Sequence, residues 1–194
     1  MRYHWSFILC CLFWVISPQR SIAQYKYEKE FRLKEQAVPR KALAFFPEDL
    51  DMKKLKWYAE ENLEGNSIEA KFILDKKRYS VEFDTLGKLQ DIEIQFKKNE
   101  LPASILTSIE QLLSVTFDRF KWKRIQLQYV GNDLLWNQIW PSLKKQADIV
   151  INYEIVVQTK KGKAFKLYEC LFNENGELIR QSEIIFRNTD NLEY

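Results

Sequence analysis

Histidine and cysteine are scarce in this sequence, which has one histidine (His4) and three cysteines among 194 residues. His4 and two of the cysteines lie within the first 23 residues, so Cys170 stands alone in the chain beyond them. Without histidine, that part of the chain has no imidazole for a Ser-His or Cys-His pair and no histidine ligand for zinc. A single cysteine also excludes an internal disulfide and a thiolate metal site. We therefore expect no metal and no cofactor.

Residues 1–23 have the three parts of a cleavable signal peptide. Arg2 belongs to a short basic start, and residues 5–16 are almost wholly apolar. Ser21 and Ala23 then place small residues at the two positions that a signal peptidase reads. This apolar run is shorter than the roughly 20 residues that a membrane-spanning helix needs. We expect cleavage after Ala23 and a periplasmic or secreted protein without a stable membrane anchor.

Charge is nearly balanced in the predicted mature chain. The sequence has 30 Lys+Arg and 27 Asp+Glu, and residues 1–23 contain two arginines and no acid, so 30 − 2 = 28 basic residues face 27 acidic ones. A net charge of +1 does not favour binding to phosphate backbones, and we expect no nucleic-acid partner. The mature length of 194 − 23 = 171 residues suits one ordinary domain or two small ones packed together.

Two segments of the chain align with each other without a gap. Residues 30–39 and 93–102 share glutamate, lysine and proline, and their apolar positions correspond. Each predicts a short strand, a polar turn and then a helix that begins near the proline, because apolar residues follow at helical spacing. Further downstream, alternating apolar residues predict more strands. Aspartate or asparagine shortly before glycine, at residues 84–87 and 173–176, predicts two tight hairpins.

This pattern predicts an α+β fold of tandem helix-plus-antiparallel-sheet repeats in two layers. Strands that alternate apolar with polar residues present one face to a core and the other to water, and one helix per repeat would cover the apolar face. We expect a first repeat with an N-terminal strand over residues 24–98, a second repeat over 99–187 and a polar tail over 188–194. No Gly/Ser-rich or Pro-rich linker separates the repeats, which favours one compact body over two small domains.

Several short stretches stand out in the predicted first repeat: Lys56-Trp57-Tyr58, Ile68-Glu69-Ala70-Lys71-Phe72, Tyr79-Ser80-Val81-Glu82-Phe83-Asp84, Gly87-Lys88-Leu89 and Asp91-Ile92-Glu93-Ile94. Together they resemble the PepSY-like family of exported bacterial proteins, also described as β-lactamase-inhibitor-like. The resemblance extends from about residue 28 to 186. It implies a β-lactamase-inhibitor-protein-like fold and no catalytic residue set. PepSY domains are associated with restraining peptidases, and β-lactamase inhibitor proteins grip a partner enzyme with a concave sheet.

The predicted second repeat carries an insertion at about 131–148. Within it, Trp136 and Trp140 share one helical face with Ile139 and Leu143. If exposed, these tryptophans would form a surface for a partner or ligand, since tryptophan is enriched at interface hot spots. If buried, they would form a lid on the open end of the sheet. Both interpretations stay open.

The candidate binding surface comprises five aromatic residues of the insertion and of predicted strands: Trp136, Trp140, Trp122, Tyr129 and Trp57. Glu60, Glu61 and Glu64 resemble the paired carboxylates of glycoside chemistry, although a solvated face explains them too. Cys170 aligns with Val81 at a half-buried strand position, so we expect a buried and inert thiol.

Three functions are consistent with these residues. The first is an exported, non-enzymatic binding protein that engages another envelope or secreted protein through a sheet face or the insertion; restraint or inhibition of an envelope hydrolase is one version. The second is a periplasmic small-ligand or glycan-binding protein, which needs an enclosed apolar pocket. The third is a carboxylate-dependent hydrolase, which needs two converging acids, one of them protonated near neutral pH. The lack of the usual catalytic groups favours binding over catalysis.

Overall fold

The computed structural model describes residues 24–63, 65–131, 149–161 and 164–185. Its strands and helices follow in this order: β1 (Gln24–Lys26), β2 (Glu28–Leu33), 3-10 helix η1 (Glu35–Ala37), α1 (Arg40–Leu43), β3 (Lys53–Asn62), β4 (Gly65–Leu74), β5 (Lys77–Asp84), β6 (Leu89–Gln95), 3-10 helix η2 (Lys98–Glu100), α2 (Ala103–Thr116), β7 (Phe120–Val130), β8 (Val150–Lys161), β9 (Ala164–Asn173) and β10 (Leu178–Ile184). Within these described ranges, no helix has the length and apolar character needed to cross a membrane.

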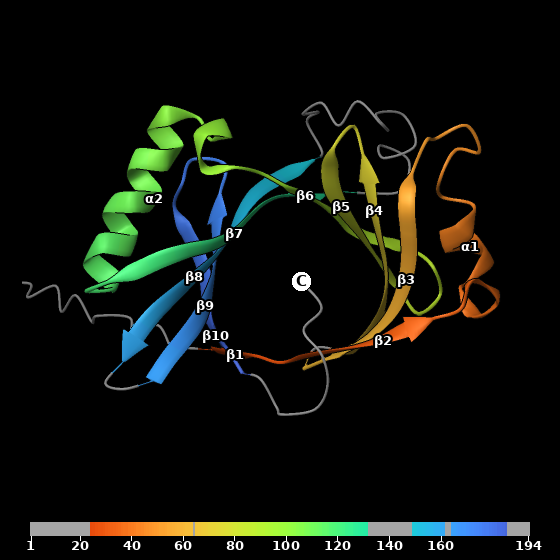
Figure 1. Cartoon of the computed structure of the whole chain (residues 1–194), viewed down its shortest axis with the longest axis horizontal. Coiled ribbons are helices and arrows are strands. Elements are labelled where there is room, and N and C mark those ends of the chain that lie inside the picture. Colours follow the sequence, from red (N-terminus) through yellow and green to blue (C-terminus); the bar gives the residue numbers. More distant parts are fainter. Residues whose placement is uncertain (1–23, 64, 132–148, 162–163, 186–194) are drawn as a thin grey trace, which may run out of the picture.

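The ten strands form one sheet that nearly closes into a ring, because a single short segment supplies both of its edges (Figure 1). β1 pairs in parallel with β10, and β2 pairs in antiparallel with β3. Only Tyr27 separates β1 from β2. We call residues 24–33 the strap, since they join the two ends of the sheet. All other neighbouring strands are antiparallel.

The predicted α+β architecture of tandem helix-plus-sheet repeats in two layers is wrong. The structure is one nearly closed ten-stranded sheet with two short α-helices on the outside of the ring (Figure 1). α1 has 4 residues and α2 has 14. The reason for the error is the strap. Its first strand has only 3 residues, too few to show an alternating pattern, yet its pairing protects an edge that would otherwise be open.

Local predictions around the helices and turns are confirmed. Pro39 and Pro102 precede the first residues of α1 and α2, where a missing N–H has no cost. The predicted apolar stripe of α2 is buried at Ile105 and Ile109. Both hairpins also form, between β5 and β6 and between β9 and β10.

The two hairpin turns need glycine for backbone conformation and for space. Gly87 has a φ of +81°, and a Cβ there would lie 2.8 Å from the backbone nitrogen of Ala42 in α1. Gly176 has a φ of +80°, and its Cβ would lie 3.1 Å from the Cβ of Ser108 in α2. Positive φ is open to glycine at little cost. Each turn can therefore pack directly against a helix.

The hydrophobic core lies between the helices and the outer face of the sheet. Phe46, which follows α1, makes edge-to-face contacts with Trp57 and Phe72. Under α2, Ile109 and Phe172 have no exposed surface and belong to the same core cluster. Because side chains alternate along a strand, apolar residues that point outward to the helices leave the polar residues between them on the inner face of the ring.

Candidate binding site on the inner sheet face

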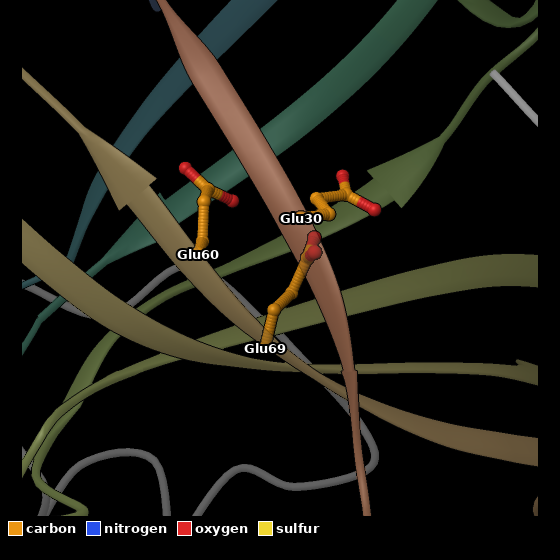
Figure 2. A group of neighbouring side chains, drawn as sticks. All are labelled: Glu30, Glu60 and Glu69. Atoms are coloured by element: carbon orange, nitrogen blue, oxygen red, sulfur yellow. The ribbon is translucent and has the colours of Figure 1, made fainter. Parts of the chain in front are cut away.

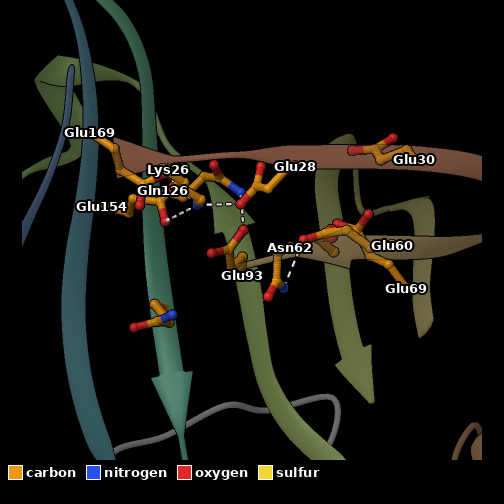
Figure 3. Close-up of polar contacts among 12 residues, drawn as sticks. Lys26, Glu28, Glu30, Glu60, Asn62, Glu69, Glu93, Gln126, Glu154 and Glu169 are labelled. Carbon is orange, nitrogen blue, oxygen red and sulfur yellow. Dashed lines mark hydrogen bonds and ion pairs between the residues drawn. The ribbon is translucent and has the colours of Figure 1, made fainter. Parts of the chain in front are cut away.

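The inner face of the ring carries a concentrated group of acidic side chains (Figure 3). They come from β2 to β6, β8 and β9 and act on one another electrostatically, and we call them the inner acidic cluster: Glu28, Glu30, Glu60, Glu69, Glu82, Asp91, Glu93, Glu154 and Glu169. Glu60, Glu69, Glu154 and Glu169 are buried. Buried acids need a cation, a hydrogen-bond donor or a proton.

Lys26 of the strap is the cation at one side of the cluster. Its ammonium lies 2.6 Å from Glu28, 2.5 Å from Glu169 and 3.9 Å from Glu154. Burial alone would lower the pKa of Lys26, but the surrounding carboxylates outweigh it and raise the pKa well above its usual value. Lys26 therefore stays charged and ties the strap to β8 and β9.

Arg124 of β7 completes this side of the cluster. Its guanidinium donates a hydrogen bond of 3.0 Å to Glu154. Burial opposes ionisation of Glu154, but Lys26 and Arg124 together lower its pKa. The neighbouring Glu169 behaves differently, because burial and the charge of Glu154 raise its pKa to about 7 in spite of Lys26. The two cations thus neutralise Glu154 and leave Glu169 partly protonated near neutral pH.

Lys71 of β4 is the cation at the other side of the cluster. Its ammonium lies 2.7 Å from Glu30 and 2.9 Å from Glu69. The carboxyl groups of Glu30, Glu60 and Glu69 lie close together, with one oxygen of each within 4.8 Å of the others (Figure 2). This spacing could suit a divalent cation with oxygen ligands. The ammonium of Lys71 already contacts two of the three carboxylates, so Lys71 supplies the positive charge that a bound cation would otherwise provide.

Four acids of the cluster have no basic side chain within ion-pair distance among the described residues: Glu60, beside the Lys71 group, and Glu82, Asp91 and Glu93 on the strands between the two groups. We call them the unpaired acids. Glu82 lies directly opposite Asp91 on β6 and directly opposite Glu69 on β4. Like charges in directly opposed positions destabilise a sheet. Three adjacent strands therefore hold a row of acids, in which Lys71 pairs with Glu69 but no basic side chain of the described residues lies within ion-pair distance of Glu82 or Asp91.

Burial raises the pKa of every unpaired acid. For Glu60 it acts together with the charges of Glu28, Glu69 and Glu82 and raises the pKa to about 8. The pKa of Asp91 is raised well above its usual value by burial and then by Glu82. Burial and then Glu154 do the same for Glu93. For Glu82, burial raises the pKa, although the nearby Ser67 hydroxyl opposes the change. At neutral pH Glu60 therefore keeps its proton more often than not, and an arriving cation would favour its release. For Glu82, Asp91 and Glu93 the pKa shift has the same direction.

Side-chain amides surround the unpaired acids on β7 and β8. The amide nitrogen of Gln126 donates to Glu93, and that of Gln128 donates to Asp91 at 3.0 Å. The amide nitrogen of Asn152 donates to Gln128, also at 3.0 Å. The side-chain oxygens of Gln126 and Asn152 are buried and have no hydrogen-bond partner among the described residues. The inner face therefore offers acceptors that still lack donors.

The structure does not gather the predicted aromatic residues into one surface. Trp57 and Tyr129 are buried at 3% and 7% exposure on the outer face of the sheet, and Trp57 also lines an open groove of about 400 Å³ beside the strap. Trp122 is half-buried, with the Lys98 ammonium over its ring. Trp136 and Trp140 lie outside the described residues, as does nearly all of the predicted insertion. The aromatic binding surface and the repeat boundaries stay predictions.

Sequence reasoning missed the inner acidic cluster, although a signal was present. The acids were interpreted as the solvated face of alternating strands, as in the assignment of Glu60 and Glu61 to such a face. In fact Glu60 faces inward and is buried, while Glu61 is exposed on the opposite face of β3. A solvated face usually mixes both charge signs. Here the polar positions at Glu82, Asp91 and Glu93 are all acidic, and that bias was readable.

Comparisons with known proteins find the fold in solved structures. No protein-family model matches the chain, and no curated protein sequence matches it significantly. A DUF2874 family protein from Bacteroides ovatus has a TM-score of 0.50 at 11% identity, over 75% of this chain and 87% of that one. A DUF2874 family protein from Bacteroides uniformis has a TM-score of 0.49 at 14% identity, over 75% of this chain and 89% of that one. A BLIP-like protein from Bacteroides fragilis has a TM-score of 0.48 at 17% identity, over 79% of this chain and 92% of that one.

At these identities the likeness concerns the fold alone. One of the structures is described as BLIP-like, and the β-lactamase-inhibitor-like resemblance of this chain stays a prediction. None of the three is described as a PepSY protein, so the PepSY relation stays a prediction.

Proposed function

We propose that this chain is an exported, non-catalytic binding protein that engages another protein through the inner face of its sheet. The observation that carries the proposal is the set of unpaired acids, which have no basic side chain within ion-pair distance among the described residues and lie near two buried amide oxygens, of Gln126 and Asn152, that have no hydrogen-bond partner there. Such a face gains free energy when a partner brings positive charge, because desolvated carboxylates are then both paired and hydrogen-bonded. The outer face, in contrast, is already covered by α1, α2 and the core.

Export and the kind of partner are inferred from the sequence. The predicted signal peptide places the mature chain in the envelope or outside the cell, so its partner would be an envelope or secreted protein. Restraint of an envelope hydrolase is the form of binding that the resemblance implies. The inner face is reachable at its rim, since the side chains of Arg124 and Arg180 are 44% and 38% exposed.

Site-specific photo-crosslinking tests this proposal. A photo-reactive amino acid replaces Arg180 on the inner face in one version of the full chain and Glu110 on α2 in a matched version, with side chains 38% and 42% exposed. In cells that produce the protein, we expect adducts with one discrete protein from position 180 and none from position 110. Adducts from position 110 alone, equal labelling at both positions, or no adduct at either would contradict binding through the inner face.

A carboxylate-dependent hydrolase is a second candidate, favoured by the group around Glu60. Its pKa of about 8, caused by burial and by neighbouring acids, keeps it protonated at neutral pH, as a general acid requires. Glu30 and Glu69 lie close enough to serve as the second carboxylate. A panel of aryl glycosides tests this function. Release of the aryl alcohol that disappears in Glu60→Gln would support a hydrolase, whereas no turnover by the native chain would exclude glycoside cleavage of these substrates.

A further inference from the structure

The inner face already holds primary ammonium groups in two places, both supplied by this chain. Lys26 reaches in from the strap and contacts carboxylates of β2 and β9. Lys71 joins a carboxylate of β2 to one of β4. In both places a single ammonium is shared by acids of different strands, which suits its three donors. The unpaired acids lie between these two places and lack such a group.

The unpaired acids have the surroundings of an ammonium site that is not filled from within the chain. Gln126 and Asn152 are 8% and 6% exposed, and each has an amide oxygen without a hydrogen-bond partner among the described residues. Each amide nitrogen is directed into the same network, toward Glu93 and Gln128. A buried acceptor without a donor typically costs about 1–3 kcal/mol. Among the described residues, the unpaired acids therefore lack a charged partner and the two amide oxygens lack a hydrogen-bond donor. One ammonium group, which is charged and has three N–H donors, can supply both.

The spacing of the acids argues against a single metal ion as the missing group. Within the described ranges, the one set of three carboxylates with oxygens within 4.8 Å of one another is Glu30, Glu60 and Glu69, and Lys71 contacts two of them. Glu82, Asp91 and Glu93 do not converge in this way. Divalent cations need several oxygens at about 2.0–2.6 Å from one point. Hydrogen-bonding ammonium groups can instead be shared among acids that are spread along neighbouring strands.

A compact ammonium also fits the depth of the site better than a guanidinium. The side chain of Lys26 is 22% exposed and reaches the most buried carboxylate of the cluster, Glu169, which is 2% exposed. The two arginines lie nearer the rim: Arg124 is 44% and Arg180 38% exposed, and their contacts with Glu169 are 4.0 and 3.8 Å long. The Arg124 guanidinium does reach Glu154, which is 4% exposed, at 3.0 Å, but the closest contact with Glu169 is made by the slender ammonium chain of Lys26.

We propose that Glu82, Asp91 and Glu93, with the side-chain oxygens of Gln126 and Asn152, form a site for the primary ammonium of a lysine side chain presented by the partner protein. The inference rests on the proposed function and adds the chemistry by which the inner face recognises its partner. Lysine residues on an exposed segment of that partner enter the ring beside Lys26 and Lys71 and pair with the unpaired acids. Acetylated lysine, which has no charge, is rejected.

Isothermal titration with a defined peptide tests the site. The probe is a decapeptide of alternating lysine and serine, titrated at low salt into the full chain processed and purified from producing cells. The comparison arms are the same peptide with acetylated lysines, an arginine–serine peptide, spermine and calcium chloride. We expect the lysine peptide to bind and the acetylated peptide not to bind. The arginine peptide should bind at least about 10-fold more weakly, a difference of about 1.4 kcal/mol.

A double variant locates the binding. Glu82→Gln with Asp91→Asn should weaken the lysine peptide at least about 10-fold, which corresponds to about 1.4 kcal/mol. The matched control, Glu48→Gln with Asp49→Asn, removes the same two charges from an exposed loop outside the ring and should bind as the native chain does. Near-UV circular dichroism verifies that both variants fold. If the double variant does not fold, Glu93→Gln replaces it as the test of the site.

The outcomes separate this inference from the proposed function. Equal binding of the lysine peptide to native and double-variant chains, or of lysine and acetyl-lysine peptides to the native chain, would overturn the ammonium site. Spermine binding without peptide binding would assign the site to a small polyamine, and calcium binding alone would assign it to a metal. Either of these two results would also overturn the proposal that the site binds a lysine side chain of a partner protein. If position 180 crosslinks to a protein but no lysine peptide binds, binding through the inner face stands and the lysine site falls.

Discussion

Neutralising Glu60 should stabilise the protein at neutral pH. Burial and neighbouring acids raise the pKa of this group from 4.5 to about 8. The folded state therefore holds the proton more tightly than the unfolded state, so stability falls as the pH rises from about 4.5 to about 8. At about pH 7 the penalty is (7 − 4.5) × 1.36, or up to about 3 kcal/mol. Glu60→Gln keeps the shape of the side chain and removes this penalty.

Urea denaturation followed by tryptophan fluorescence measures the effect. Near pH 7 the free energy of unfolding of Glu60→Gln should exceed that of the native chain by about 1–3 kcal/mol, and near pH 4.5 the two should agree. Glu61→Gln is the matched control, because Glu61 is the next residue of β3 and is exposed on the opposite face. Equal stability of Glu60→Gln and the native chain at both pH values, or a loss near pH 7, would refute the reasoning about the inner acidic cluster.

Three further predictions concern the strap, a hairpin turn and the thiol. Lys26→Met leaves three carboxylates without their ammonium and should lower the free energy of unfolding, measured in urea, by about 3 kcal/mol. The control is Lys29→Met, which should change this free energy little, because the Lys29 ammonium lies over the Phe31 ring. Gly87→Ala should destabilise by at least about 2 kcal/mol, and more than Gly65→Ala, where an added Cβ meets nothing within 4 Å. Burial and then the Glu169 charge raise the pKa of Cys170 to about 12, so Ellman's reagent should label it only after unfolding; fast labelling of the native chain would contradict its burial.

Local features of the fold were predictable because their causes lie in neighbouring residues. Alternating apolar positions predict the strands, and the stripe that contains Ile105 and Ile109 predicts α2. Gly87 and Gly176 follow from the turn conformation. The burial of Cys170 was predicted by alignment with Val81, and both are buried.

The closure of the ring was not predictable from local patterns. It depends on the pairing of Tyr25 with Glu183 and of Glu30 with Glu60, which joins strands at both ends of the described chain through the strap. The acids on the inner face were visible in the sequence, but only closure turns a solvated face into a partly buried one. The raised pKa values of the unpaired acids and the lack of donors for the Gln126 and Asn152 side-chain oxygens arise from this long-range pairing. The approach of Lys26 to Glu169 has the same cause.

Nuclear magnetic resonance of the isotope-labelled protein with the lysine–serine peptide tests the central claim most directly. The side-chain amide groups of Gln126 and Asn152 report on the inner face, because both are buried beside the unpaired acids. We predict that the peptide shifts these side-chain signals and backbone amides of β5 to β8, and leaves α1 and α2 unchanged. Shifts confined to the helices or the outer face, or no shifts at peptide concentrations that saturate the titration, would contradict a binding site on the inner face of the ring.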